Sequence, residues 1–413
     1  MLQIQSPGPK PTAPHPILNM AFRIFFASAG LFAIITMLLW IFVYTGNLNL
    51  GGVDFHPFYW HAHEMFYGYA LAVIAGFLLT AVQTWTGVTM PYGWHLFGIY
   101  IFWFIARMLW GITAFNPSQE TTTLLIILAF IADIIFMVWM ALTVTIAVIK
   151  AKQKRQIGIV AKILLLSLAN ALCYIGILTK DLNLNRIGLY FGFYLIIGLV
   201  LTVGRRVTPF FIEKGLAHGG HSIQFTPKNS ATLDRLSLAF FGVFFVVDIF
   251  FPNPILLTIA ALATALVNII RLSGWYHSAI WKMPLLWSLF LAFLGMIIGF
   301  VLYALQAWGI GTHSIAVHGL ALSGIAMMTV AMMTRVSLGH TGRNIHQPPK
   351  TVPWMLALLV LSFIARVILP LLNMNLYITW IMVAQTAWLL CFILFCISYI
   401  PILSKQRVDG VFG

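Results

Sequence analysis

The chain has 413 residues, of which 61% are hydrophobic and 8% charged, and only 9 acidic residues stand against 23 Lys and Arg. This composition excludes an ordinary soluble domain, in which about a quarter of the residues are charged. The net charge of +14 does not indicate nucleic acid here, because the basic residues cluster between long apolar runs. That placement indicates membrane topology and contact with anionic lipid. The three cysteines lie inside apolar runs without a CxxC spacing, so we expect them to serve packing.

Twelve apolar segments are about 20 residues long, the length that a helix needs to cross a bilayer. We therefore predict an all-α integral membrane protein, with an N-terminal tail over 1–21, a single twelve-helix domain over 22–402 and a C-terminal tail over 403–413. The N-terminal stretch has no apolar core or cleavage site, so we expect no signal peptide. The predicted spans are 22–44, 61–84, 93–115, 122–149, 157–179, 187–211, 233–251, 254–272, 284–308, 313–335, 353–373 and 376–402.

The basic loops predict the orientation of these helices. Lys and Arg concentrate in cytoplasmic loops, and the loop over 150–155 holds four of them. Counting from this loop in both directions places both termini in the cytoplasm. Helices 2 and 10 then begin on the outer side of the membrane.

Helix 2 opens with an unusual concentration of polar side chains, His56, His61, His63 and Glu64. Such groups at membrane depth need a partner or a function, because burying them unpaired is costly. His63 and, at the start of helix 10, His318 would suit axial ligation of haem b between the two helices. The alternative is that each histidine lies at the membrane surface with one nitrogen among the lipid headgroups.

An internal repeat supports this pairing. Residues 63–87 align without a gap to 318–342, and Phe-Ile-Ala-Arg occurs at 104–107 and again at 363–366. We therefore predict that helices 2 and 3 correspond to helices 10 and 11. Arg107 and Arg366 would lie in the outer halves of their helices, where acids are scarce and Glu64 and Asp248 are the nearest candidates. We expect them to pair with haem propionates.

A second metal is also conceivable from the spacing. His61 and Glu64 are three residues apart and share a helix face, and His313 precedes His318 by five residues. A His–carboxylate set is compatible with copper, iron or zinc. The alternative is a hydrogen-bonded pair that caps the helix start.

Three further features lie at the predicted cytoplasmic ends or in mid-membrane. His340 and Arg343, after helix 10, and Arg205 and Arg206, at the end of helix 6, would bind an anion or form solvated basic helix ends. Pro209 is expected to stop helix 6. Asp133, in the middle of helix 4, is a candidate proton-path residue or a partner for a neighbouring helix.

Several motifs resemble the NnrS family of bacterial inner-membrane proteins. They include Trp60-His-Ala-His-Glu-Met65, Gly204-Arg-Arg-Val-x-Pro-Phe-Phe211 and Met333-Thr-Arg-Val-Ser-Leu-Gly-His-Thr-Gly-Arg343. The resemblance implies a haem- and copper-containing membrane protein linked to nitric oxide stress and denitrification, with nitric oxide or iron–nitrosyl species as ligands. It implies no defined reaction and no particular electron donor. The residues at matching motif positions are His61, His63, Glu64, His318, His340 and Arg343.

One departure from the family bears on copper. Relatives often carry a His in helix 9 where this chain has Phe290. Three functions stay open at this point. The haem protein could turn over or sense nitric oxide, the same histidines could act as transient ligands in a transporter of a metal or haem, or the protein could be a scaffold for denitrification enzymes.

Overall fold

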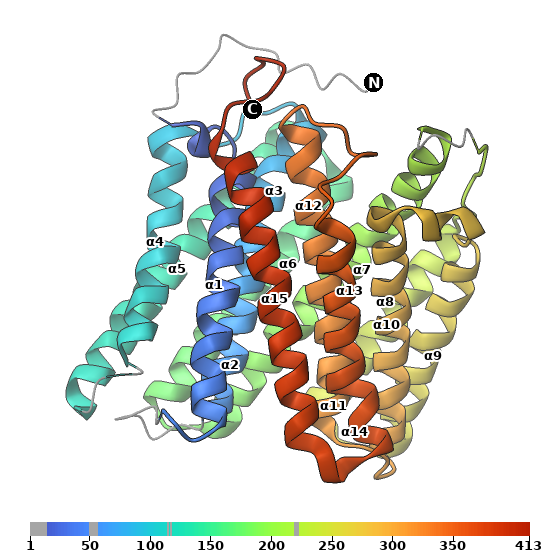
Figure 1. Cartoon of the computed structure of the whole chain (residues 1–413). Coiled ribbons are helices and arrows are strands. Elements are labelled where there is room, and N and C mark those ends of the chain that lie inside the picture. The colour runs from blue at the N-terminus through green and yellow to red at the C-terminus, as the bar shows by residue number, and fades with distance from the viewer. Residues whose placement is uncertain (1–14, 49–56, 114, 116–117, 219–222) are drawn as a thin grey trace. The chain divides into compact units, whose positions relative to one another are not determined.

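The computed structural model describes residues 15–48, 57–113, 115, 118–218 and 223–413, and every regular element in these ranges is a helix. The contacts divide the chain into two compact units. Unit 1 comprises 1–195, 336–343 and 395–413, and unit 2 comprises 196–335 and 344–394. Figure 1 labels the helices. The longer helical segments are α1 (Ala21–Tyr44), α2–η2–α3 (Pro57–His63, Glu64–Ala70, Leu71–Thr86), α4 (Gly93–Thr113), α5 (Gln119–Lys150), α6 (Ile157–Leu178), α7 (Leu182–His218), α8 (Ala231–Phe250), α9 (Pro254–Ser273), α10 (Pro284–Gln306), α11–η5–α12 (His313–Leu320, Ala321–Met327, Met328–His340), α13–η6–α14 (Val352–Phe363, Ile364–Ile368, Leu369–Leu372) and α15 (Tyr377–Ser404).

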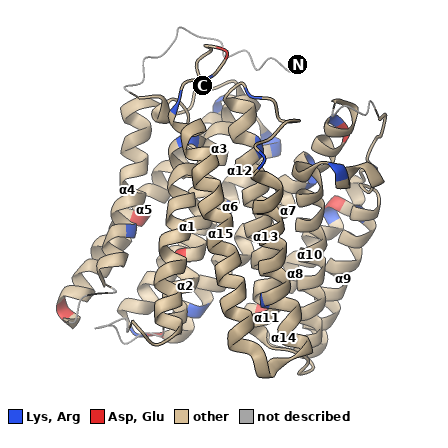
Figure 2. Ribbon diagram, in the orientation of Figure 1, with Lys and Arg blue, Asp and Glu red and all other residues tan. Residues whose placement is uncertain are grey.

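These segments confirm an all-helical, multi-pass membrane protein. Within the described ranges, eleven helices are long and apolar enough to cross a membrane. The remaining long helix, α8, has 20 residues but carries Asp234, Arg235 and Asp248. The predicted number of twelve spans and the cytoplasmic location of both termini stay predictions. Figure 2 shows how few Lys, Arg, Asp and Glu interrupt the helices, and that most of them lie near helix ends.

Short polar side chains define where several helices begin. Asn253 caps α9 by accepting hydrogen bonds from the amides of Ile255 and Leu256, both at 3.0 Å, and Pro254 occupies the first helical position. Thr312 caps α11 through the amide of Ile315. These side chains satisfy amides that have no acceptor within the helix.

The predicted end of helix 6 at Pro209 is wrong. Pro209 lies inside α7, which continues to His218. A proline inside a helix removes one hydrogen bond and usually bends the helix rather than ending it when neighbouring helices pack on both sides. The stretch after Gly204 is therefore helical for fourteen further residues and is not a loop.

The two segments related by the predicted repeat share a local irregularity. The α2–η2–α3 segment contains the π-helical segment η2 at Glu64–Ala70, and the α11–η5–α12 segment contains η5 at Ala321–Met327. A π-helical turn inserts an extra residue into an α-helix and is frequent at functional sites. In the sequence alignment proposed above the two π-helical segments are offset by only two residues. The α13–η6–α14 segment, which is the eleventh predicted span, also contains a π-helical segment, η6. The corresponding helix of the first half, α4, is regular.

Close helix packing holds each unit together. In unit 1, a Cβ on Gly188 of α7 would lie 2.5 Å from the backbone nitrogen of Cys173 on α6, so these two helices are in backbone contact there. In unit 2, Gly299 of α10 and Gly319 of α11 pack directly on each other, and a Cβ on Gly319 would lie 3.0 Å from Gly299 Cα. Small residues at such crossings are typical of membrane helices.

Candidate functional site

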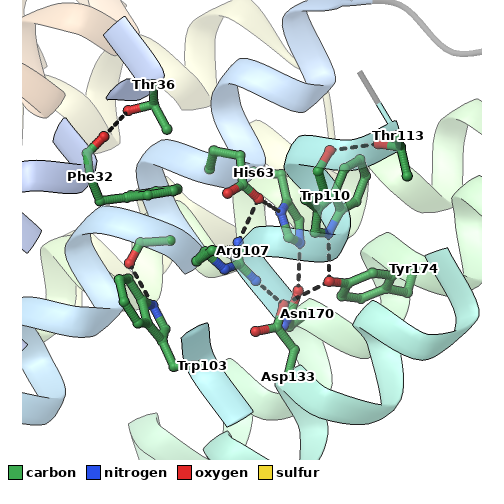
Figure 3. Close-up of polar contacts among 12 residues, drawn as sticks. Phe32, Thr36, His63, Trp103, Arg107, Trp110, Thr113, Asp133, Asn170 and Tyr174 are labelled. Carbon is green, nitrogen blue, oxygen red and sulfur yellow. Dashed lines mark hydrogen bonds and ion pairs between the residues drawn. The ribbon is translucent and has the colours of Figure 1, made fainter. Parts of the chain in front are cut away.

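A buried ion-pair cluster occupies the interior of unit 1 (Figure 3). Arg107 of α4 donates one hydrogen bond to Glu64 of η2 at 2.5 Å and another to Asp133 of α5. The three side chains are at most 2% exposed. Arg107 therefore has two protein carboxylates as partners, and the argument that it needs a haem propionate does not hold.

His63 lies against the same cluster and uses both ring nitrogens. Nδ1 is 2.9 Å from Glu64 Oε1, and Nε2 is 2.9 Å from Asn170 Oδ1 on α6. The Asn170 amide nitrogen faces the sulfur of Met137 instead, which fits this orientation of the amide. Both ring nitrogens of His63 are therefore engaged by oxygen atoms of the protein.

This arrangement pairs the buried charges. The guanidinium of Arg107 lies between the carboxyl groups of Glu64 and Asp133. Direct contact between opposite charges is the condition under which ionised groups survive away from water. His63 could contact a metal only by giving up one of its two hydrogen bonds.

Aromatic side chains surround the cluster, and two of them add hydrogen bonds to it. Tyr174 of α6 donates to Asp133 Oδ2 at 2.7 Å, and Trp110 of α4 donates to the Tyr174 hydroxyl oxygen at 2.6 Å. The rings of Tyr67, Trp110 and Tyr174 lie 5.0–5.1 Å from the His63 ring. Because these side chains are buried, their electrostatic contacts are stronger than they would be in water.

Two members of this network were absent from the sequence-based site. Asn170 is an amide in the apolar helix α6 and is 0% exposed, and Tyr174 follows it by four residues on the same face. An isolated amide in a membrane helix is the signal that could have identified α6 as part of the site.

In unit 2, the structure brings together the two predicted residues His318 and Arg366. His318 of α11 is half-buried, and its Nδ1 lies 2.7 Å from the carbonyl oxygen of Ser314. Arg366 of η6 donates to the hydroxyl of the same Ser314 at 2.8 Å. Its guanidinium carbon also lies 5.6 Å from the centroid of the Tyr377 ring.

The predicted second metal set is not gathered around one point. The His61 ring stacks on Trp40 at 4.4 Å, whereas Glu64 contacts Arg107 and His63. His313, in unit 2, packs edge-on against Tyr303. Across the described ranges no three His, Cys, Asp or Glu side chains form a group that could hold a metal. A copper site at these residues stays a prediction.

The residues predicted for the cytoplasmic side divide between the units. Arg205 pairs with Asp234 in unit 2, and Arg206 is exposed. In unit 1, the His340 ring lies 5.6 Å from the ring of Phe22, and Arg343 is half-buried. His56 lies outside the described residues. Phe290, which stands at the position of a family histidine, packs against two other aromatic rings, those of Tyr276 and Trp281.

The family model described as NnrS protein matches residues 16–407 of the 413. No curated protein matches the chain significantly.

Proposed function

The chain belongs to the NnrS family, whose membership indicates a role in the response to nitric oxide, and we propose that it acts there as a haem protein through His318 of unit 2. The observation that carries this proposal is the hydrogen bond from His318 to the Ser314 carbonyl. A histidine that ligates a metal through Nε2 almost always donates its Nδ1–H to a carbonyl or carboxylate, which holds the ring in place.

Arg366 supports the same assignment. Arg366 donates to the hydroxyl of Ser314, and the carbonyl of the same Ser314 orients His318. Ser314 therefore links the guanidinium to the proposed ligand. Guanidinium groups pair well with carboxylates such as the propionates of a porphyrin. Ser314 would therefore position both the ligand and the basic group.

The residues of unit 1 do not fit a second axial ligand in the arrangement described above. Ligation by His63 would require the loss of at least one of its two hydrogen bonds. We therefore propose His318 as the only histidine ligand rather than the His63–His318 pair. A haem iron with one protein ligand supplies an open coordination position at which nitric oxide can bind.

The absorption spectrum of the purified protein, with haem quantified per chain, tests the proposal. We expect a Soret band that is lost in His318→Ala and retained in His63→Gln if the variant folds. His218→Ala is the matched control, because His218 Nδ1 also contacts the carbonyl four residues earlier, that of Lys214, at 3.1 Å. Equal haem content in His318→Ala and wild type would refute the proposal.

The buried cluster favours a second candidate, a transporter of a metal or haem. Ionisable groups inside a membrane domain often mark ion or proton pathways, and Glu64, Arg107 and Asp133 are such groups. A colourless, folded protein that moves a metal or haem into proteoliposomes, and loses this activity in Asp133→Asn, would favour transport over the haem proposal.

A further inference from the structure

Arg335, near the end of α12 in unit 2, is a buried guanidinium without a polar partner among the described residues. It is 7% exposed, and its Nε forms no hydrogen bond there. Its guanidinium carbon lies 3.9 Å from the ring centroid of Phe211 on α7. The attraction between a cation and a ring is weaker than the hydration that a buried guanidinium loses.

No carboxylate of the described residues compensates this charge. The two acids closest in sequence to Phe211 have other partners, because Glu213 pairs with Lys214 and Asp234 pairs with Arg205 and Arg271. The segment 219–222, whose placement is not described, has the sequence Gly-Gly-His-Ser and so adds no acid. Among the described residues, no carboxylate therefore balances the charge of Arg335, and an anion from outside the chain could do so.

A buried hydroxyl lies on the same side of α7 as Phe211. Thr208 precedes Phe211 by three residues, which places the two on one helix face. It is 0% exposed, and within the described part of the chain its Oγ1 has no hydrogen-bond partner. The Thr208 hydroxyl and the ring that Arg335 contacts are thus one helical turn apart on α7.

We propose that Arg335 and Thr208 bind a small monovalent anion, of the class of chloride, nitrite and nitrate. One buried positive charge is balanced by one negative charge, whereas a phosphate dianion would leave a net buried charge. Along the α11–η5–α12 segment the site lies seventeen residues after His318, roughly 26 Å at the helical rise per residue. It is therefore separate from the proposed haem ligand and does not depend on it.

Calorimetric titration of the purified protein in sodium gluconate tests the proposal, with sodium chloride, nitrite, nitrate and phosphate as probes. We expect saturable 1:1 binding of at least one monovalent anion, weakened at least tenfold in Arg335→Gln and several-fold in Thr208→Val. Arg235→Gln is the matched control, because Arg235 is an exposed arginine of the same unit, and binding should be unchanged. Absence of saturable binding, or equal binding in Arg335→Gln, would overturn the proposal.

A second readout uses the wild-type chain and does not require a variant at Arg335 to fold. Burial lowers the pKa of His346, and the positive charges of Arg335 and His218 lower it further. An anion bound at Arg335 would offset that charge, so chloride or nitrite should raise the His346 pKa in an NMR titration. His346→Gln identifies the resonance. No change of the pKa with any monovalent anion, an equal rise with sulfate, which is a dianion across this pH range, or a copurifying phospholipid that is lost in Arg335→Gln would each contradict a small-anion site.

Discussion

Arg107 of α4 and Asp133 of α5 form an ion pair whose side chains are 1% and 0% exposed. Each charge depends on the other, because neither can reach water. Replacing Asp133 by Asn leaves Arg107 with Glu64 as its one remaining carboxylate partner. Removing one partner of a buried pair typically costs about 3–5 kcal/mol. We expect Asp133→Asn to lower the thermal midpoint of the purified protein by several degrees.

Glu120→Gln is the control for this prediction, since Glu120 is an exposed acid in the first turn of the same helix. Its thermal midpoint should stay close to that of the wild type. An Asp133→Asn variant as stable as Glu120→Gln would mean that the pair does not stabilise the fold.

The Asn170 amide is the acceptor that His63 Nε2 uses. Asn170→Leu would leave that buried donor without a partner, which typically costs about 1–3 kcal/mol. We expect a corresponding loss of stability in chemical denaturation. Ser167→Ala, on the same helix, removes a hydroxyl that bonds only the carbonyl of Ile163 one turn earlier, and should change stability much less. A similar loss of stability in both variants would show that the hydrogen bond between His63 and Asn170 does not stabilise the fold.

The length and position of the membrane helices were predictable because they follow from the length of apolar runs alone. Predicted spans such as 157–179 and 254–272 agree to within a residue with α6 and α9. The end of α7 was not predictable in the same way. Whether a proline ends or bends a helix depends on what packs around it, and Pro209 lies within a helix that continues for nine residues.

The site was predictable in part. Sequence analysis identified His63, Glu64 and Arg107 as functional candidates, because polar groups in a membrane helix need partners. It did not assign the partners, since a single sequence does not reveal that α4, α5 and α6 present Arg107, Asp133 and Asn170 to one point. Because these partners were not assigned, Arg107 was expected to pair with a haem propionate.

Gly188 of α7 permits the close approach of α6. An added Cβ would lie 2.5 Å from the Cys173 nitrogen and 2.8 Å from the Ala169 carbonyl oxygen, and backbone atoms cannot move aside as a side chain can. Overpacking of this kind lowers the free energy of unfolding by about 1–3 kcal/mol. Gly188→Ala should therefore lower the thermal midpoint. Gly111→Ala in α4 is the matched control, because its Cβ would meet nothing within 4 Å. If both variants unfold at the wild-type temperature, the two helices are not in backbone contact.

The segment after α15 is held in unit 1 by Arg407, and this attachment should depend on pH. Arg407 donates to the carbonyl of His340 at 2.9 Å and forms two hydrogen bonds with Asp409, at 2.9 and 2.6 Å. The hydrogen bonds from Arg407 are the main reason that the pKa of Asp409 is lowered from 3.8 to about 2. A carboxylate with a lowered pKa stabilises the folded arrangement above its unfolded value and loses this contribution as the pH falls.

The contribution should therefore be complete above about pH 4 and disappear between about pH 4 and pH 2. It should be small, because the Asp409 side chain is 40% exposed and solvent screens the pair. Amide exchange at Val408, whose N–H donates to the Thr341 carbonyl at 3.3 Å, reports the attachment. We expect protection at Val408, corrected for the intrinsic pH dependence, to fall across this range in the wild type. In Asp409→Asn it should be low throughout and without a step, so a step in that variant would assign the pH dependence to another group.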